Sequence, residues 1–188
     1  MTDWLAFYKR FFPTSDEAKA FVDACEAQSP PDNTAKLIMH QTQRLVSLAE
    51  DIPEIRRKRE SLQAFLLVVC AEAIAKLNSG STASIGSKAA VRSFFASLVP
   101  TALHPVLEST FTTTSTTPNR TLSLQEVADL LYEVRCDVAH EGVYWHFALS
   151  PDGTPTHTTK PSIMTRLTVA QLIDVVASGG IAAAQKHL

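Results

Sequence analysis

The chain has 188 residues, of which 45% are hydrophobic and 19% are charged. This length allows one sizeable hydrophobic core and is short for two full domains, so we expect a single domain spanning residues 1–188. The formal net charge of −2 excludes a generally basic coat protein of nucleic acid, so any RNA contact would depend on a local cationic patch.

The cysteines and the hydropathy pattern narrow the class of protein further. Cys25, Cys70 and Cys136 are far apart in the chain and lack the Cys/His spacing of a zinc site, so we expect reduced thiols, no metal and no cofactor. The longest uncharged apolar run, residues 64–71, is far below the roughly 18 residues that a membrane span needs. The N-terminus lacks the apolar core of a signal peptide. These features favour a cytoplasmic protein without a membrane partner.

The first 51 residues predict three helices, which we assign to an N-terminal helical extension. Four aromatic residues lie near one face of a first short helix that Pro13 closes: Trp4, Tyr8, Phe11 and Phe12. Thr14 and Glu17 form a capping-box pattern that opens a second helix toward Gln28. Apolar residues at helical spacing predict a third helix over residues 34–51.

The middle of the chain predicts a long central helix followed by less regular segments. Pro53 is expected to start the longest helix, which runs to Asn78 and carries an apolar stripe broad enough for the centre of a bundle. Helical spacing resumes over residues 88–110, where two prolines interrupt it. The Thr/Ser tract at residues 109–121 offers little to bury, so we expect a surface excursion there.

The next helix carries the most informative motif of the chain. Ser123 and Glu126 form a capping-box pattern at its start, and Gly142 stands where a helix ends in a left-handed residue. Its apolar positions cluster within a stripe of roughly 100°, the width of a core-facing helix. The helix ends in an Arg-x4-His pair formed by Arg135 and His140.

The C-terminal part predicts a hairpin and a last helix. Apolar and polar residues alternate after Val143, and turn residues follow at 150–153, so residues 143–167 are expected to form an inserted β-hairpin. Thr168 and Gln171 form another capping-box pattern, and Gly179 and Gly180 are expected to stop the final helix. The fold class is therefore mainly α, an antiparallel helical bundle with a short C-terminal β-hairpin.

The Arg-x4-His pair poses a geometric problem. At about 100° per residue, Arg135 and His140 lie about 140° apart on an α-helix, so they cannot share one face. Either the helix loosens before Gly142 and swings His140 round, or a second copy of the helix supplies the missing member across a homodimer interface. Asp137, three residues before His140, is placed to fix the tautomer of the imidazole.

Residues 131–142 resemble the signature of HEPN domains, α-helical bundles whose Arg-x4-6-His motif marks metal-independent endoribonucleases. The long helix that precedes the motif and residues 86–95 look like the corresponding helices of abortive-infection HEPN proteins. The resemblance implies a dimer that sets two motifs into one cleft. It also implies that Arg135 holds the scissile phosphate and that His140 acts as general base or acid while the RNA 2′-hydroxyl attacks. The expected biological role is a toxin or an antiviral-defence effector.

The chain departs from the HEPN pattern at two positions. The residue after the motif Arg is commonly polar, and here it is Cys136, for which Asp137 could substitute. HEPN toxins that a nucleotidyltransferase antitoxin silences carry Tyr two residues after the His, where this chain has Gly142. Tyr144 is near but out of register, so the sequence does not support silencing by an antitoxin of that kind. A different regulatory partner remains an open alternative.

Further candidates lie around the motif. His146 on the predicted strand could line the same cleft, and Glu72 on the long helix could approach the motif from a neighbouring helix. One dense basic run is a candidate for contact with the RNA backbone, although such runs are usually solvated faces. It consists of Arg56, Arg57, Lys58 and Arg59.

Three alternatives to catalysis stay open. His140 could serve only as a helix cap, with Arg135 in an ordinary ion pair with Glu133 or Asp137. The same fold could act without cleavage, as a HEPN-like module that binds RNA, a nucleotide or a protein. The N-terminal aromatic helix could instead make the chain an adaptor within a larger complex.

Overall fold

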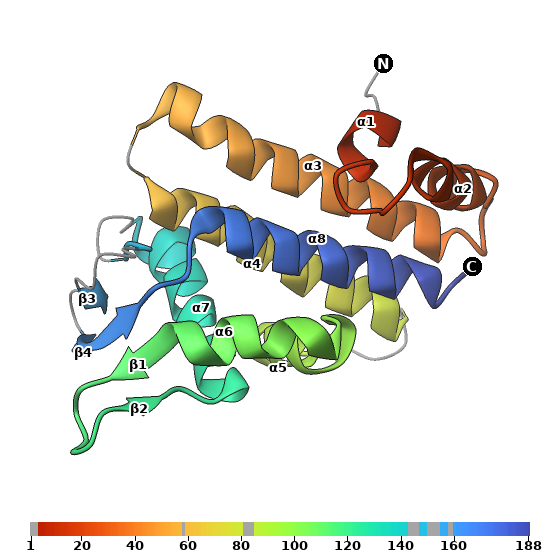
Figure 1. Cartoon of the computed structure of the whole chain (residues 1–188). Helices are drawn as coiled ribbons and strands as arrows, with labels where there is room; N and C mark the ends of the chain where they lie inside the picture. The colour runs from red at the N-terminus through yellow and green to blue at the C-terminus, as the bar shows by residue number, and fades with distance from the viewer. Residues whose placement is uncertain (1–3, 58, 81–84, 143–146, 150–154, 158–159) are drawn as a thin grey trace.

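The computed structural model describes residues 4–57, 59–80, 85–142, 147–149, 155–157 and 160–188. The described chain is a mainly α-helical bundle with a small antiparallel sheet at one end (Figure 1). The α-helices are α1 (Trp4–Tyr8), α2 (Ser15–Glu26), α3 (Thr34–Ile55), α4 (Glu60–Ser79), α5 (Ser87–Ser93), α6 (His104–Thr110), α7 (Leu124–Cys136) and α8 (Val169–Gln185). The strands are β1 (Phe111–Thr113), β2 (Arg120–Thr121), β3 (Pro155–His157) and β4 (Lys160–Thr165).

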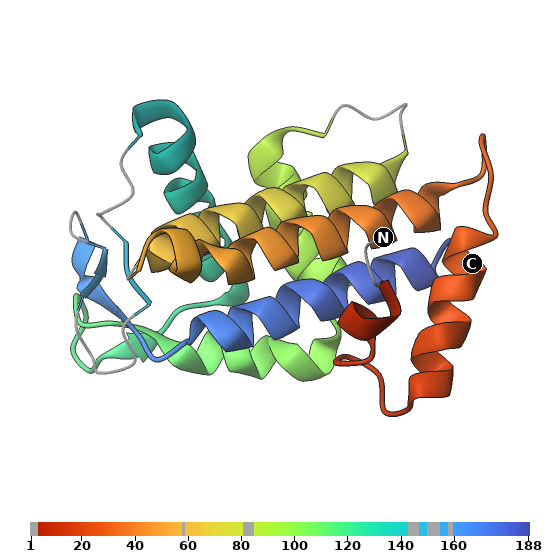
Figure 2. The ribbon, with the colours of Figure 1, turned by 90° about the horizontal axis from the view of Figure 1, so that it is seen from above.

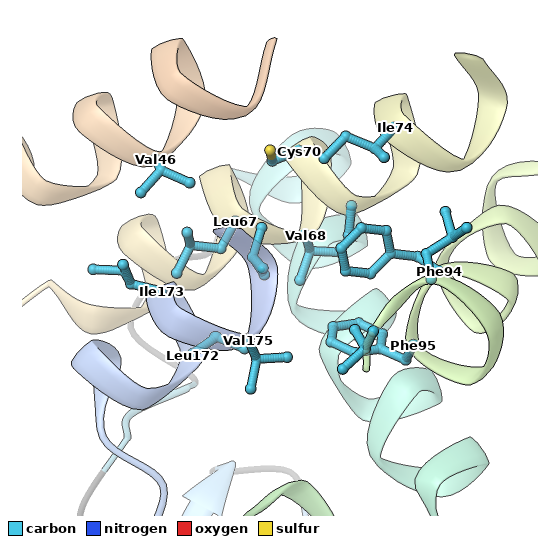
Figure 3. Close-up of a cluster of buried hydrophobic side chains, with 14 of the residues drawn as sticks. Val46, Leu67, Val68, Cys70, Ile74, Phe94, Phe95, Leu172, Ile173 and Val175 are labelled. Atoms are coloured by element: carbon cyan, nitrogen blue, oxygen red, sulfur yellow. The ribbon is translucent and has the colours of Figure 1, made fainter. Parts of the chain in front are cut away.

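Helices α3, α4 and α8 form the centre of the bundle. Figure 2 shows α3 and α4 side by side with α8 against them, while α5 and α7 pack on the other side of α4. Because α4 contacts all four of these helices, it is apolar around most of its circumference. Its Leu67, Val68 and Ile74 meet Phe94 and Leu172 in the core (Figure 3). Burying each such side chain contributes about 1.5–3 kcal/mol, so this contact region is the main source of stability.

Several helix ends follow the local signals in the sequence. The Thr14 hydroxyl accepts a hydrogen bond from the backbone N–H of Glu17 and opens α2. Full capping boxes open α7, with Ser123 and Glu126, and α8, with Thr168 and Gln171. These three predicted helix starts are confirmed.

The prediction that Pro53 starts the long helix is wrong. Pro53 lies inside the last turn of α3, and the long helix α4 begins only at Glu60. Since proline has no N–H, it cannot satisfy the carbonyl four residues earlier, that of Ala49. The side-chain amide of Gln63 donates to this carbonyl at 2.9 Å. A residue of α4 thus replaces the missing backbone donor and ties α4 to α3.

The prediction that Gly179 and Gly180 stop the last helix is also wrong. Both are buried, and α8 continues to Gln185. A Cβ on Gly179 would lie 2.5 Å from Cζ of Phe94, and one on Gly180 would lie 2.3 Å from Oγ1 of Thr42. The glycines therefore allow close packing within a continuous helix.

The Thr/Ser tract at residues 109–121 is only in part the predicted surface excursion. Residues 114–121 are exposed, but the tract also contains the last two residues of α6 and the strands β1 and β2. Its Phe111 is fully buried and begins β1, which pairs with both β2 and β4. The sheet order is β2-β1-β4-β3, all antiparallel. The second strand of the predicted hairpin is confirmed as β4, and it pairs with β3 and β1. Residues 143–146 of the predicted first strand lie outside the described residues.

The segment between α5 and β1 is irregular where its prolines stand. A π-helical turn, η1 (Phe94–Leu98), follows α5 directly, and Pro100 precedes a 3-10 turn, η2 (Thr101–Leu103).

Among the described residues, no single helix has the length and apolar character of a membrane span. Residues 87–98 and 101–110 meet those criteria only as a pair, with a bend of 102° between them.

Candidate functional site

The motif helix changes its winding just before it ends. After Cys136, α7 passes into a π-helical turn, η3 (Asp137–Glu141), and the N–H of Gly142 donates to the carbonyl of Asp137 five residues earlier. Gly142 has φ 65° and ψ 15°, the left-handed conformation that the sequence predicts there. A π turn places residues i and i+5 on one face, unlike an α-helix. Arg135 Nη1 and His140 Nε2 accordingly lie 3.2 Å apart.

This contact resolves the geometric problem within one chain. Of the two alternatives from the sequence, the loosening of the helix before Gly142 is confirmed. A guanidinium can only donate, so Nε2 of His140 must accept the hydrogen bond from Arg135. That hydrogen bond requires the tautomer of His140 that carries its proton on Nδ1. Its Nε2 lone pair points at the cationic group.

Two further contacts hold the Arg135 guanidinium. Its Nε donates to Oε2 of Glu72 on α4 at 3.1 Å, and its Cζ lies 6.0 Å from the centre of the Tyr132 ring. The Glu72 side chain is 9% exposed and that of Arg135 is 20% exposed, so solvent screens this pair only in part. The expectation that Glu72 approaches the motif from a neighbouring helix is confirmed. Sequence reasoning missed Tyr132, although its position three residues before Arg135 put it within reach.

The charge of Glu72 is itself stabilised. Burial alone would raise the pKa of the Glu72 carboxyl, but hydrogen bonds from Lys76 and Ser87 and the charge of Arg135 outweigh it, so this pKa lies below its usual value. Lys76 Nζ lies 2.6 Å from Glu72 Oε1 and 3.3 Å from Ser87 Oγ. An ionised Glu72 therefore sits between two cations and orients one of them toward His140.

The sequence offers Glu133 and Asp137 as ion-pair partners of Arg135, and the structure adds Glu72. The Glu133 carboxylate binds Lys160 Nζ of β4. This ion pair joins β4 of the sheet to α7.

The remaining predicted site residues divide into described and undescribed ones. Cys136 is half-buried, and a hydrogen bond with its thiol is the largest cause that raises the pKa of Tyr132. Asp137 begins the π turn, and its role in orienting His140 stays a prediction. Tyr144 and His146 lie outside the described residues.

The basic run lies at the turn between α3 and α4. Arg56 and Arg57 are exposed after the end of α3, Arg59 is half-exposed at the start of α4, and Lys58 lies outside the described residues. Glu72 contacts Arg135 more than three helical turns further along α4. The start of α4, where the run lies, is thus separated along the helix from the residue that binds Arg135.

Metal ligation and comparison with known proteins complete the description. Within the described ranges, no group of three or more His, Cys, Asp or Glu side chains has the arrangement to hold a metal ion. Comparisons with protein-family models, with curated proteins and with solved structures yield no match to this chain. The function is therefore inferred from the geometry of the site.

Proposed function

We propose that the chain is a metal-independent endoribonuclease of the HEPN type, with Arg135 and His140 at its centre. The observation that carries the proposal is the 3.2 Å contact between a held cation and a neutral imidazole. Arginine is the side chain best suited to bind a phosphate through several N–H groups. Histidine is the side chain best suited to accept and return a proton near neutral pH.

The geometry supports a division of labour between the two side chains. Glu72 holds the Nε side of the guanidinium, which carries five N–H donors in all. The Nη1 side faces His140, so a phosphate bound there would lie beside Nε2. When Nη1 turns from His140 to that phosphate, the Nε2 lone pair becomes available to a ribose 2′-hydroxyl beside it. His140 is exposed, which gives a polymer access to it.

The proposed reaction is an internal transfer at phosphorus. His140 Nε2 takes the proton of the 2′-hydroxyl, the 2′ oxygen bonds to phosphorus, and the bond from phosphorus to the 5′ oxygen breaks. The leaving 5′ oxygen takes up a proton from solvent or from the second copy of the motif in a homodimer. Arg135 stabilises the negative charge that grows on the phosphate oxygens. The products are a 2′,3′-cyclic phosphate and a 5′-hydroxyl.

The proposal includes the setting that the HEPN resemblance implies. The protein would be a cytoplasmic homodimer that acts on RNA as a toxin or defence effector. A regulatory partner such as an antitoxin would restrain it. These parts rest on the resemblance, whereas the roles of Arg135 and His140 rest also on their contact.

The test is cleavage of end-labelled RNA in EDTA by wild type, Arg135→Ala and His140→Ala at matched folded concentration. We expect cyclic-phosphate ends from wild type and their loss in both variants. Matched controls are Arg44→Ala, an exposed arginine on α3, and His104→Ala, which contacts the carbonyl of Val99. Both controls should cleave as wild type does.

Two results would contradict the proposal. One is the absence of cleavage by wild type, and the other is equal cleavage by all variants. If wild type binds RNA without cutting it, the same site belongs to a binding module. If His140→Ala mainly lowers the melting temperature, His140 is a structural helix cap.

A further inference from the structure

Three exposed cations from two helices lie along the surface that leads away from Arg135. Lys88 and Arg92 stand four residues apart on α5 and therefore share a face. Lys76 of α4 reaches Ser87 at the start of α5, with Nζ 3.3 Å from the hydroxyl oxygen. We call Lys76, Lys88 and Arg92 the cationic strip.

Two carboxylates connect the cationic strip to α7 at both ends. Asp129 of α7 accepts two hydrogen bonds from Arg92, both of 2.6 Å, and lies 3.7 Å from Lys88 Nζ. Glu72 joins Lys76 to Arg135. Cations that are distant in sequence are thus tied into one region over α4, α5 and α7. Figure 2 shows α5 and the end of α7 rising on the same side of α4.

The carboxylates lie deeper than the cations that they bind. The side chains of the cationic strip are 40–48% exposed, whereas Glu72 is 9% and Asp129 is 25% exposed. A ligand that approaches from solvent therefore meets the cations first. With Arg135 included, four cations stand over two carboxylates, so the region keeps an excess of positive charge.

The acidic residues elsewhere on the motif helix favour the approach of a polyanion from one side. Glu133 faces β4, where it binds Lys160, and Glu141 is exposed at the far end of the π turn. A polyanion that reaches Arg135 is therefore favoured on the side of α4 and α5.

We propose that the cationic strip holds the phosphate backbone of single-stranded RNA next to the Arg135–His140 pair. Lysine and arginine contacts to phosphates release counterions, which gives affinity without reading the base sequence. The inference rests on the proposed function in so far as Arg135 marks where the bound strand is cut. Its test measures binding alone.

The experiment is fluorescence anisotropy with a short labelled RNA that carries 2′-O-methyl groups throughout, so that no hydroxyl can attack. The test variant is the double substitution Lys88→Gln and Arg92→Gln. The matched control is Lys19→Gln with Arg10→Gln, because Lys19 also pairs with an Asp and Arg10 also forms a two-bond pair with a carboxylate. Both variants lose the same net charge from two cations that are paired with carboxylates.

We expect wild type to bind with an affinity that falls steeply with salt. Each lost phosphate contact lowers the slope of log K against log salt by about 0.7, so the test variant should lose about 1.4 and the control nothing. An equal slope for both variants, or no binding by wild type, would overturn the inference. Circular dichroism melting of each variant verifies that the proteins compared are folded.

The outcomes of the two proposals are separable. If cleavage requires Arg135 and His140 but RNA binding is unchanged by the Lys88 and Arg92 substitutions, the cationic strip is refuted. The ribonuclease proposal is supported in that case. If RNA binding requires Lys88 and Arg92 but wild type does not cleave RNA, the cationic strip is supported and the ribonuclease proposal is refuted.

Discussion

Glu72 is the residue whose substitution best tests how the site is held together. Replacing it in Glu72→Gln keeps the shape of the side chain and removes its charge. In the folded protein this carboxylate accepts hydrogen bonds from Lys76 and from Arg135. We expect the variant to fold with reduced stability and to hold Arg135 less firmly beside His140.

The structure sets the size of the effect. A hydrogen bond to a charged group contributes about 1.5–3 kcal/mol net, against about 0.5–1.5 kcal/mol for a neutral one, so neutralising Glu72 costs about 1 kcal/mol at Arg135. Lys76 is 43% exposed, and its i,i+4 pair contributes about 0.5 kcal/mol. The free energy of unfolding should therefore fall by about 1.5 kcal/mol. Loss of positioning at Arg135 should lower kcat about tenfold or more.

The assay is urea unfolding in a double-mutant cycle of Glu72→Gln and Arg135→Gln. We expect a coupling free energy of about 1 kcal/mol between the two positions. Cleavage by the double variant should be no slower than by Arg135→Gln alone. Glu50→Gln, which removes the carboxylate partner of Arg10, should lose stability without losing cleavage. A coupling free energy of zero would refute the argument that Glu72 holds Arg135.

Three further predictions concern stability. The pKa of the Glu126 carboxyl is lowered to about 2, chiefly by hydrogen bonds from Arg120 and next by one from the backbone N–H of Ser123. The ionised carboxylate therefore stabilises the fold fully above about pH 4.3, and this stabilisation is lost as the pH falls toward 2. In urea titrations across that range, Glu126→Gln should flatten the pH dependence, and an unchanged pH dependence would contradict this. Gly179→Ala should destabilise by about 1–3 kcal/mol because its Cβ meets the Phe94 ring, and thermal unfolding measures the loss. Gly142→Ala should cost about 1 kcal/mol through its positive φ, and a melting temperature equal to that of wild type would argue against the left-handed helix end.

The parts of the fold that the sequence predicts correctly depend on neighbours within a few residues. The capping box of Ser123 and Glu126 and the left-handed Gly142 are examples, since each needs only local backbone geometry. The apolar stripe likewise identified α4 as a central helix. Local chemistry of this kind is visible in a single sequence.

The errors share one physical cause, which is a partner distant in sequence. Pro53 stays helical because Gln63 of the next helix replaces its missing donor. Gly179 serves close packing within α8 and does not end the helix, because the Phe94 ring leaves no room for a Cβ there. The cationic strip could not be foreseen for the same reason, because folding alone brings Lys76 beside α5. In each case a tertiary contact overrides the local preference.

The motif itself shows how a conflict in the sequence can identify a site. An α-helix would separate Arg135 from His140 by about 140°, and a regular helix would have kept its i→i+4 hydrogen bonds. The chain instead takes up a π turn, which is rare and appears frequently at functional sites. No residue of η3 is fully buried, so the turn adds no side chain to the hydrophobic core. Places where a fold departs from its local rules without a gain in packing are those where function is expected, and here the departure joins a held cation to an imidazole.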